Sequence, residues 1–373
     1  MKKNYFMLAA TTMMLAACAQ TDVVNEVNMV DEPQAIGFET FAQKLTRAEN
    51  NQTDYSDDLE KHHTSFNVYA GKSVKGATQA VYSNTSEGTV NFGNSSWTAS
   101  PLKYWDKTAT EYYFYAGAPA NAAWEFAMTT ADDYSTGYLE YPNFSLAGEN
   151  LADGSNTRKD SWKDDRTTND VDLMIAAPKT VVRADYNKTS PDVVNMQFNH
   201  ILSRLNILVK KGNNIASDQE LKLKSLDVFN LKSIGSFDES KKIADQTPMI
   251  DRWTIADDAA TYTLSAATVS DKIEGPIYTH QYLVIPQAVN FEEIDTDGSS
   301  EKKEVYFRIE YTIDSETYYA FYNLAAAFGQ NVSLNFQEGW ENTLTITINP
   351  NAIQFDANAS TWQTYVNPEK IID

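Results

Sequence analysis

The alternation of apolar and polar residues, repeated in many short runs, is the feature that most constrains this fold. Such runs recur at close spacing, for example at residues 64–70, 222–231, 304–313 and 343–348, and residues 112–116 are an aromatic run that also predicts a strand. A period of two residues places alternate side chains on opposite faces of a strand. No window keeps apolar residues at i, i+3, i+4 and i+7 over three helical turns. Many short strands without alternating helices predict an all-β fold made of β-sandwiches.

The size of the chain divides the predicted fold in two. A chain of 373 residues is longer than one hydrophobic core usually supports. The polar stretch at residues 183–191 is the candidate boundary, so we expect an N-terminal domain at 35–187 and a C-terminal domain at 188–373.

Two local patterns give finer expectations. In the long strand-like run at 193–210, Met196 and Phe198 share one parity and Leu205 and Ile207 the other. This change of phase predicts a bulge or a strand that passes from one sheet to another. Residues 80–82 and 89–92 flank the turn-prone residues 84–88, which predicts a hairpin.

The N-terminus predicts export and lipidation. Lys2 and Lys3 precede an apolar run at residues 5–17, which is shorter than the roughly 20 residues of a membrane span. The run ends in Leu15-Ala16-Ala17-Cys18, which resembles a bacterial lipobox with Cys18 as the lipidated residue. We therefore expect a lipoprotein signal peptide at 1–17 and a polar tether at 18–34. An ordinary signal peptide followed by an incidental cysteine is the alternative.

Charge and cysteine content exclude several classes of function. The formal net charge is −21, whereas nucleic-acid binding needs an excess of Lys and Arg, so we expect no nucleic-acid partner. An acidic surface also repels anionic lipids, so membrane attachment would be hydrophobic or covalent. Cys18 is the single cysteine, which excludes intramolecular disulfides and cysteine-based zinc sites.

The sequence contains no recognisable catalytic or metal-binding motif. There is no Gly-x-Ser-x-Gly, Walker loop, dinucleotide-binding loop or His-Glu-x-x-His. His62 and His63 lie in a polar stretch, where a solvated loop is expected, and His200 is expected to be a hydrogen-bonded core residue. We therefore expect no enzyme activity, no catalytic residue, no metal ligand and no cofactor.

Several segments, in order along nearly the whole chain, resemble the fimbrillin family, the type V pilins of Gram-negative gut and oral anaerobes. Besides the lipobox, they are residues 36–38 (IGF), 45–48 (LTRA), 170–176 (DVDLMIA), 198–205 (FNHILSRL), 282–287 (YLVIPQ), 339–342 (GWEN), 353–355 (IQF) and Trp362. The resemblance implies two transthyretin-like β-sandwich domains in tandem and a structural role in a surface fibre.

The resemblance also implies a route of assembly. Family members are exported as lipoproteins, and an arginine-specific protease cuts after the junction arginine, here Arg47 before Ala48. The cut removes the first strand, here residues 35–45, and a strand from another fimbrial subunit fills the groove. The donor would come from residues 352–373. The expected location is the outer membrane and its fimbrium, with a role in adhesion.

Three alternatives stay open at this point. Trp97, Trp105, Trp124 and Trp162 could form a sugar-binding surface on a glycan-binding lipoprotein, although tryptophans in β-sandwiches more often pack in the core. The chain could also be an anchor subunit that keeps its lipid and is not cut, in which case Arg47 is an incidental linker residue. A secreted hydrolase is disfavoured by the missing motifs.

Overall fold

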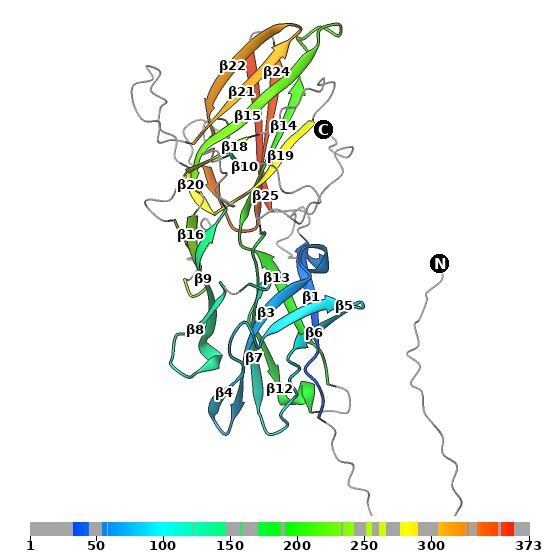
Figure 1. The fold of residues 1–373 in the computed structure, drawn as a ribbon, viewed down its shortest axis with the longest axis vertical. Helices are drawn as coiled ribbons and strands as arrows, with labels where there is room; N and C mark the ends of the chain where they lie inside the picture. Colours follow the sequence, from blue (N-terminus) through cyan, green and yellow to red (C-terminus); the bar gives the residue numbers. More distant parts are fainter. Residues whose placement is uncertain are drawn as a thin grey trace, which may run out of the picture. The chain divides into compact units, whose positions relative to one another are not determined.

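The computed structural model describes residues 33–44, 54–57, 59–121, 123–146, 157–158, 171–187, 191–232, 234–241, 251–255, 261–265, 277–289, 305–324, 327, 334–349 and 352–361. Ala35–Asp373 form one compact unit, distinct from Met1–Gln34. The described residues form an all-β fold (Figure 1). Their helices are short, namely η1 (Leu59–Lys61), η2 (Tyr134–Thr136) and α1 (Arg183–Tyr186). None of the described helices has the length and apolar character needed to cross a bilayer.

A ten-stranded sheet contains the first strand of the described chain. Its strand order is β12-β7-β11-β13-β1-β6-β5-β3-β4, with β2 paired to β1 outside this path. The strands are β1 (Phe38–Lys44), β2 (Asp54–Asp57), β3 (Ser65–Val74), β4 (Ala77–Tyr82), β5 (Thr89–Gly93), β6 (Ser96–Ser100), β7 (Glu111–Ala118), β11 (Met174–Ala176), β12 (Lys179–Val182) and β13 (Val194–His200).

The predicted hairpin of residues 80–82 and 89–92 is wrong. Both segments are strands, but β4 and β5 pair with different stretches of the ten-residue β3. The turn between them packs against β3, because the Val68 N–H donates to the Gly88 carbonyl at 2.7 Å. A Cβ at Gly88 would lie 1.8 Å from the Val68 carbonyl oxygen, so this approach requires glycine. A strand long enough for two partners thus replaces the local hairpin.

The remaining strands form four smaller sheets. A five-stranded sheet has the order β10-β18-β15-β21-β22, and four-stranded sheets have the orders β19-β14-β24-β25 and β17-β16-β9-β8, while β20 pairs with β23. Their bounds are β8 (Glu125–Met128), β9 (Gly137–Ser145), β10 (Thr157–Arg158), β14 (Ser203–Lys211), β15 (Leu221–Lys232), β16 (Ile234–Asp238), β17 (Trp253–Ile255), β18 (Thr261–Ser265), β19 (Ile277–Val284), β20 (Gln287–Val289), β21 (Tyr306–Ile313), β22 (Glu316–Asn323), β23 (Leu334–Phe336), β24 (Trp340–Asn349) and β25 (Ala352–Thr361).

Three buried apolar clusters hold these sheets together. One lies within the ten-stranded sheet and includes Phe66, Phe114 and Phe198. A second joins that sheet to the sheet of β9 and β16, with aromatic residues such as Trp124. The third lies between the five-stranded sheet and the sheet of β14 and β24, which pack their apolar faces together. Burial of these faces is the main favourable term in folding.

The predicted passage of a strand from one sheet to another is confirmed. β13 pairs with β1, whereas β14 pairs with β19 and β24. The change falls at Ile201 and Leu202, which are fully buried and come after the predicted boundary at 187/188. Tertiary hydrogen bonds satisfy the backbone here, since the Ile201 carbonyl accepts from the Trp253 indole at 2.8 Å and the Leu202 carbonyl from the Gly339 N–H at 2.9 Å.

A half-buried carboxyl beside the β9–β16 pair predicts a pH-dependent stability. Burial raises the pKa of Glu239 to about 7, although the Leu139 N–H donates to this carboxyl at 2.9 Å and Arg252 lies near. A raised pKa means that the folded state prefers the protonated form. Its contribution is therefore complete below the ordinary pKa of 4.5 and is lost as the pH rises through about 7.

We expect the free energy of unfolding to fall by about 2–3 kcal/mol between pH 5 and pH 8 through this group. Urea unfolding at both pH values measures the effect. Glu239→Gln should remove this part of the fall, while the exposed Asp218→Asn should leave it unchanged. Burial also raises the pKa of Glu338 to about 7, so a further fall should persist in Glu239→Gln. An equal fall in wild type and Glu239→Gln would assign the pH dependence to other groups.

Candidate functional site: the first strand and its slot

The first strand alternates buried and exposed side chains, as its sequence predicts. Ile36, Phe38, Thr40 and Ala42 are buried, with exposed fractions of 1, 6, 4 and 0%, while Glu39 is exposed. The expectation that Ile36 and Phe38 point into the N-terminal core is therefore confirmed. One face of β1 is thus part of the core, although the strand lies close to the end of the described chain.

Both edges of β1 have strand partners. On one edge, residues 38–42 pair in parallel with residues 194–198 of β13, and Figure 1 shows the two strands side by side. On the other edge, Phe38 lies opposite Trp97 of β6, and Ala42 lies opposite Asp57 of β2. We call the space that β1 fills between these neighbours the first-strand slot.

Aromatic side chains line the first-strand slot. The ring of Phe38 lies edge-on to Phe66 and Phe114, with ring centroids 6.0 Å apart in both pairs. Tyr82 completes the surroundings of Phe38 at 6.4 Å. Edge-to-face pairs are favourable beyond the area that they bury. The slot therefore recognises both a backbone, through two strand edges, and an apolar side chain at one position.

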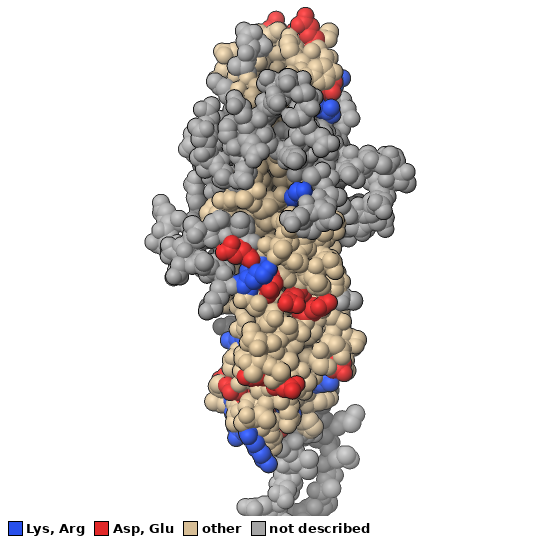
Figure 2. Space-filling model, turned by 90° about the vertical axis from the view of Figure 1, so that its left-hand side faces the viewer, with Lys and Arg blue, Asp and Glu red and all other residues tan. Residues whose placement is uncertain are grey.

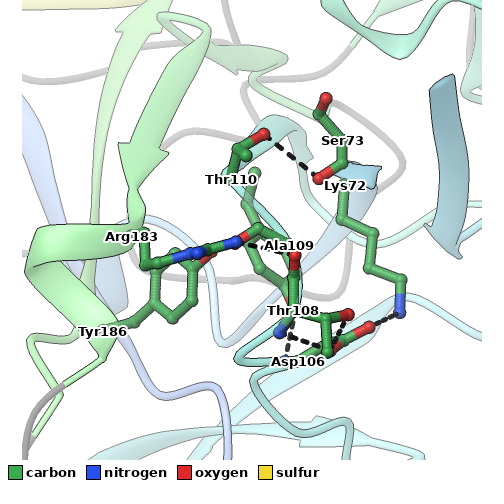
Figure 3. Close-up of polar contacts among 9 residues, drawn as sticks. Lys72, Ser73, Asp106, Thr108, Ala109, Thr110, Arg183 and Tyr186 are labelled. Atoms are coloured by element: carbon green, nitrogen blue, oxygen red, sulfur yellow. Dashed lines mark hydrogen bonds and ion pairs between the residues drawn. The ribbon is translucent and has the colours of Figure 1, made fainter. Parts of the chain in front are cut away.

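A polar network holds the loop that receives the start of this strand. The Ile36 N–H donates to the Lys103 carbonyl at 2.9 Å, and Ala35 forms a bridge with Tyr104. Just after these residues, Asp106 pairs with Lys72 at 2.7 Å and accepts from Thr108, so that the pKa of Asp106 falls to about 2 (Figure 3).

Arg183 clamps the same loop from the other side. Its Nε donates to the Ala109 carbonyl and its Nη2 to the Thr108 carbonyl, both at 2.7 Å, and Tyr186 Oη donates to the Ala109 carbonyl at 2.6 Å (Figure 3). Tyr186 also stacks on Trp105 with ring centroids 4.7 Å apart. The loop that meets β1 is thus fixed in place before any partner binds.

Arg183→Ala should lower the free energy of unfolding by about 2 kcal/mol, because two hydrogen bonds from a charged donor to backbone carbonyls are lost. Urea unfolding measures the change. Lys179→Ala, at an exposed position of the neighbouring β12, is the matched control and should stay within about 0.5 kcal/mol of wild type. Equal effects of the two substitutions would show that the clamp contributes little.

The residues predicted to be modified lie outside the described residues. This holds for Cys18, Arg47 and Ala48. The predicted donor segment at 352–373 is described as far as Thr361, and this part forms β25, which pairs with β24 over all ten of its residues. In this structure the first half of the candidate donor therefore lies in its own chain's sheet.

The alternative of a sugar-binding tryptophan surface finds no support in the described tryptophans. Trp97, Trp105 and Trp124 are buried, with exposed fractions of 9, 6 and 2%. Each packs in an aromatic cluster of the core, and Trp162 lies outside the described residues. These three side chains therefore stabilise the fold and offer no surface for a glycan.

Charged side chains are dispersed over the face of the molecule that Figure 2 shows. The Lys and Arg side chains of the described residues stand singly or beside Asp and Glu on this face, and they form no continuous basic stripe there. Nucleic-acid interfaces concentrate Lys and Arg on one surface. This face therefore has none of the electrostatic character of such an interface.

Sequence reasoning missed a cluster of histidines around one carboxylate. His62 and His63 are half-buried, so the expectation of a solvated loop is wrong. His63 Nε2 lies 2.6 Å from the Asp172 carbonyl, and His200 Nδ1 lies 2.8 Å from Asp172 Oδ2. Burial lowers the pKa of His63 to about 4. The expectation that His200 is a hydrogen-bonded core residue is confirmed, since it is 4% exposed.

Comparison with known proteins identifies the family. The family model described as fimbrillin-like matches residues 46–362, so the chain belongs to the fimbrillin-like family. No curated protein matches the chain.

Solved structures resemble the fold at low sequence identity. A fimbrial protein from Bacteroides vulgatus has a TM-score of 0.51 at 16% identity, covering 88% of this chain and all (100%) of that one. A Bacteroides uniformis protein described as one of cell adhesion has a TM-score of 0.47 at 14% identity, covering 90% of this chain and 99% of that one. The first of these likenesses supports the all-β fold.

Proposed function

We propose that the chain is a structural, non-enzymatic subunit of a cell-surface fimbrium that supports adhesion. Proteolysis after Arg47 would remove β1, and a strand from another subunit would then fill the first-strand slot. The observation that carries this proposal is the position of β1, which is paired on both edges and buried on one face. The membership in the fimbrillin-like family and the likeness to a fimbrial protein support it.

Loss of β1 would leave the first-strand slot open to pairing with another strand. Five backbone positions of β13 and the facing positions of β6 and β2 would lose their partner. A strand from a second chain would satisfy these groups and fill the aromatic pocket of Phe66 and Phe114. A head-to-tail contact of this kind does not close on itself, so it builds a fibre. The family match begins at residue 46, beside Arg47.

Export as a lipoprotein belongs to the same proposal. Signal peptide 1–17 would direct the chain to the outer membrane, where a lipid on Cys18 and the tether at 18–34 would hold the precursor. The partners are then other fimbrial subunits, an arginine-specific protease and the outer membrane through the lipid. No cofactor takes part.

Two parallel strand pairs support a tandem of transthyretin-like sandwich domains. β1 pairs in parallel with β13, and β14 pairs in parallel with β24. Each pair joins the first described strand of one half of the chain to a strand near the end of that half. The repeated arrangement fits two domains of one topology, which we propose follow one another across Ile201 and Leu202.

The donor would come from residues 352–373. Because β25 already pairs with β24, either β25 leaves this edge or residues beyond Thr361 supply the donor strand. Ile353 is half-buried against the C-terminal core, which opposes release of the start of β25. We therefore place the donor toward the end of the segment.

The surface form of the protein tests the proposal directly. Its N-terminus should be Ala48, and unheated SDS extracts should contain a ladder of high-molecular-weight species. A lipidated monomer that begins at Cys18 would contradict assembly by cleavage and favour the anchor or glycan-binding alternatives. Purification from cells followed by N-terminal sequencing and immunoblotting provides both readouts.

A further inference from the structure

Three side chains from distant parts of the chain converge at the end of β13. His62 follows η1, Asp172 precedes β11, and His200 is the last residue of β13. Each offers one ligand atom, and the three atoms lie within 4.8 Å of one another. Among the described residues, this is the group of His, Cys, Asp and Glu side chains whose spacing suits a shared ion.

The cluster is fixed by contacts of its own. His200 Nδ1 lies 2.8 Å from Asp172 Oδ2, and the rings of His62 and His200 stand edge-to-face with centroids 5.3 Å apart. His63 holds the backbone of the same aspartate, since its Nε2 lies 2.6 Å from the Asp172 carbonyl. The carboxylate is therefore positioned from two sides.

The carboxylate keeps one oxygen available for a ligand. The Asp172 side chain is 13% exposed. Its Oδ1 is buried and has no hydrogen-bond partner in the described part of the chain. An oxygen of this kind is costly to bury and is satisfied by a hydrogen-bond donor or a cation. The imidazoles of His62 and His200 are the other ligands that such a cation would find here.

We propose that His62, Asp172 and His200 bind one divalent transition-metal ion, with Zn²⁺ as the representative ion. Two imidazoles and one carboxylate suit Zn²⁺ and its neighbours in the first transition row, whereas Ca²⁺ and Mg²⁺ prefer sets made of oxygen ligands.

The ion would be a shared ligand of three chain segments that already meet through the contacts of His63 and His200 with Asp172. His62 belongs to the segment that follows β2, and β2 pairs with β1. If β1 is removed as proposed above, β2 loses this partner, and the ion would hold residues 59–63 against β11 and β13. This consequence rests on the proposed function, whereas binding of the ion does not.

Zinc binding by the purified full-length chain tests the site. The experiment uses a Cys18→Ala background, which removes the single thiol. After treatment with EDTA and buffer exchange at pH 7.5, isothermal titration with Zn²⁺ should give about one equivalent per chain. The midpoint of thermal unfolding should rise with Zn²⁺ and should not rise with Mg²⁺.

Matched variants assign the ligands. His62→Gln, at a half-buried position, should weaken Zn²⁺ binding more than about 10-fold, and its circular dichroism without metal should equal that of wild type. Glu60→Gln, which changes an acidic residue of η1 outside this group of three ligands, should bind Zn²⁺ like wild type. Binding that is unchanged in His62→Gln, equally lost in both variants or absent in wild type would overturn the proposal. Because none of these measurements uses fibre assembly, failure of this site leaves the proposed function untouched.

Discussion

Replacing Arg47 by alanine should give a folded, lipidated chain that builds no fibre. The cut after Arg47 is the step that makes β1 a separate segment, and only a separate segment can be displaced by a competing strand. Immunoblots of unheated SDS extracts should show a ladder for wild type and a single band for Arg47→Ala. We expect the amount of high-molecular-weight ladder to fall by at least about 10-fold. A strand that stays covalently attached competes for the slot at a high effective concentration, so a donor strand cannot replace it.

Two controls make this result specific. Lys44→Ala, which removes the nearest upstream cation but keeps the junction, should assemble like wild type. Trypsin treatment of the wild-type precursor should start assembly in solution. High-molecular-weight fibres from Arg47→Ala cells would refute activation at this position, and the uncut anchor would then explain the chain better.

Much of the fold could be predicted because period-two patterning reports on burial directly. Residues 343–348 alternate and residues 112–116 are an aromatic run, and both segments fall inside strands, β24 and β7. The change of parity between Phe198 and Leu205 also has a simple cause, since the buried face of the chain changes when it passes from one sheet to the next. Local sequence is sufficient for features that depend on the local environment of a strand.

Strand pairing and side-chain convergence could not be predicted in the same way. β4 and β5 are neighbours in sequence and resemble a hairpin, yet each pairs with β3. The ten residues of β3 are enough for β5 to pair with its first part and β4 with its second part. His62, Asp172 and His200 are separated by long stretches of chain, and each has an ordinary local context. Their meeting depends on the antiparallel pairing of β11 with β13, in which Met174 lies opposite His200, and on the position of η1, and no local pattern encodes either.

Phe38→Ala should produce the largest loss of stability of any single change in the first strand. Phe38 is 6% exposed and its ring meets Phe66, Tyr82 and Phe114. Removing such a ring costs about 3–4 kcal/mol through lost burial and the cavity that remains. Urea unfolding of the uncut precursor should show this loss. Glu39→Ala, the exposed neighbour on the opposite face of β1, should change the free energy of unfolding by less than about 0.5 kcal/mol.

The same pair of variants separates the anchoring of β1 from its pairing. After trypsin cleavage of purified precursor, the β1 peptide of wild type should leave slowly as donor strands replace it, because backbone pairing on two edges and the buried ring of Phe38 act together. If the stability lost in Phe38→Ala lowers the barrier to dissociation of the β1 peptide, the peptide should dissociate about 100-fold faster than in wild type, since each 1.4 kcal/mol is a factor of about ten. Size-exclusion chromatography coupled to mass spectrometry follows the release with time. A release rate that is the same in Phe38→Ala and Glu39→Ala would mean that the backbone alone holds β1, and that a donor strand needs no apolar residue at the position of Phe38.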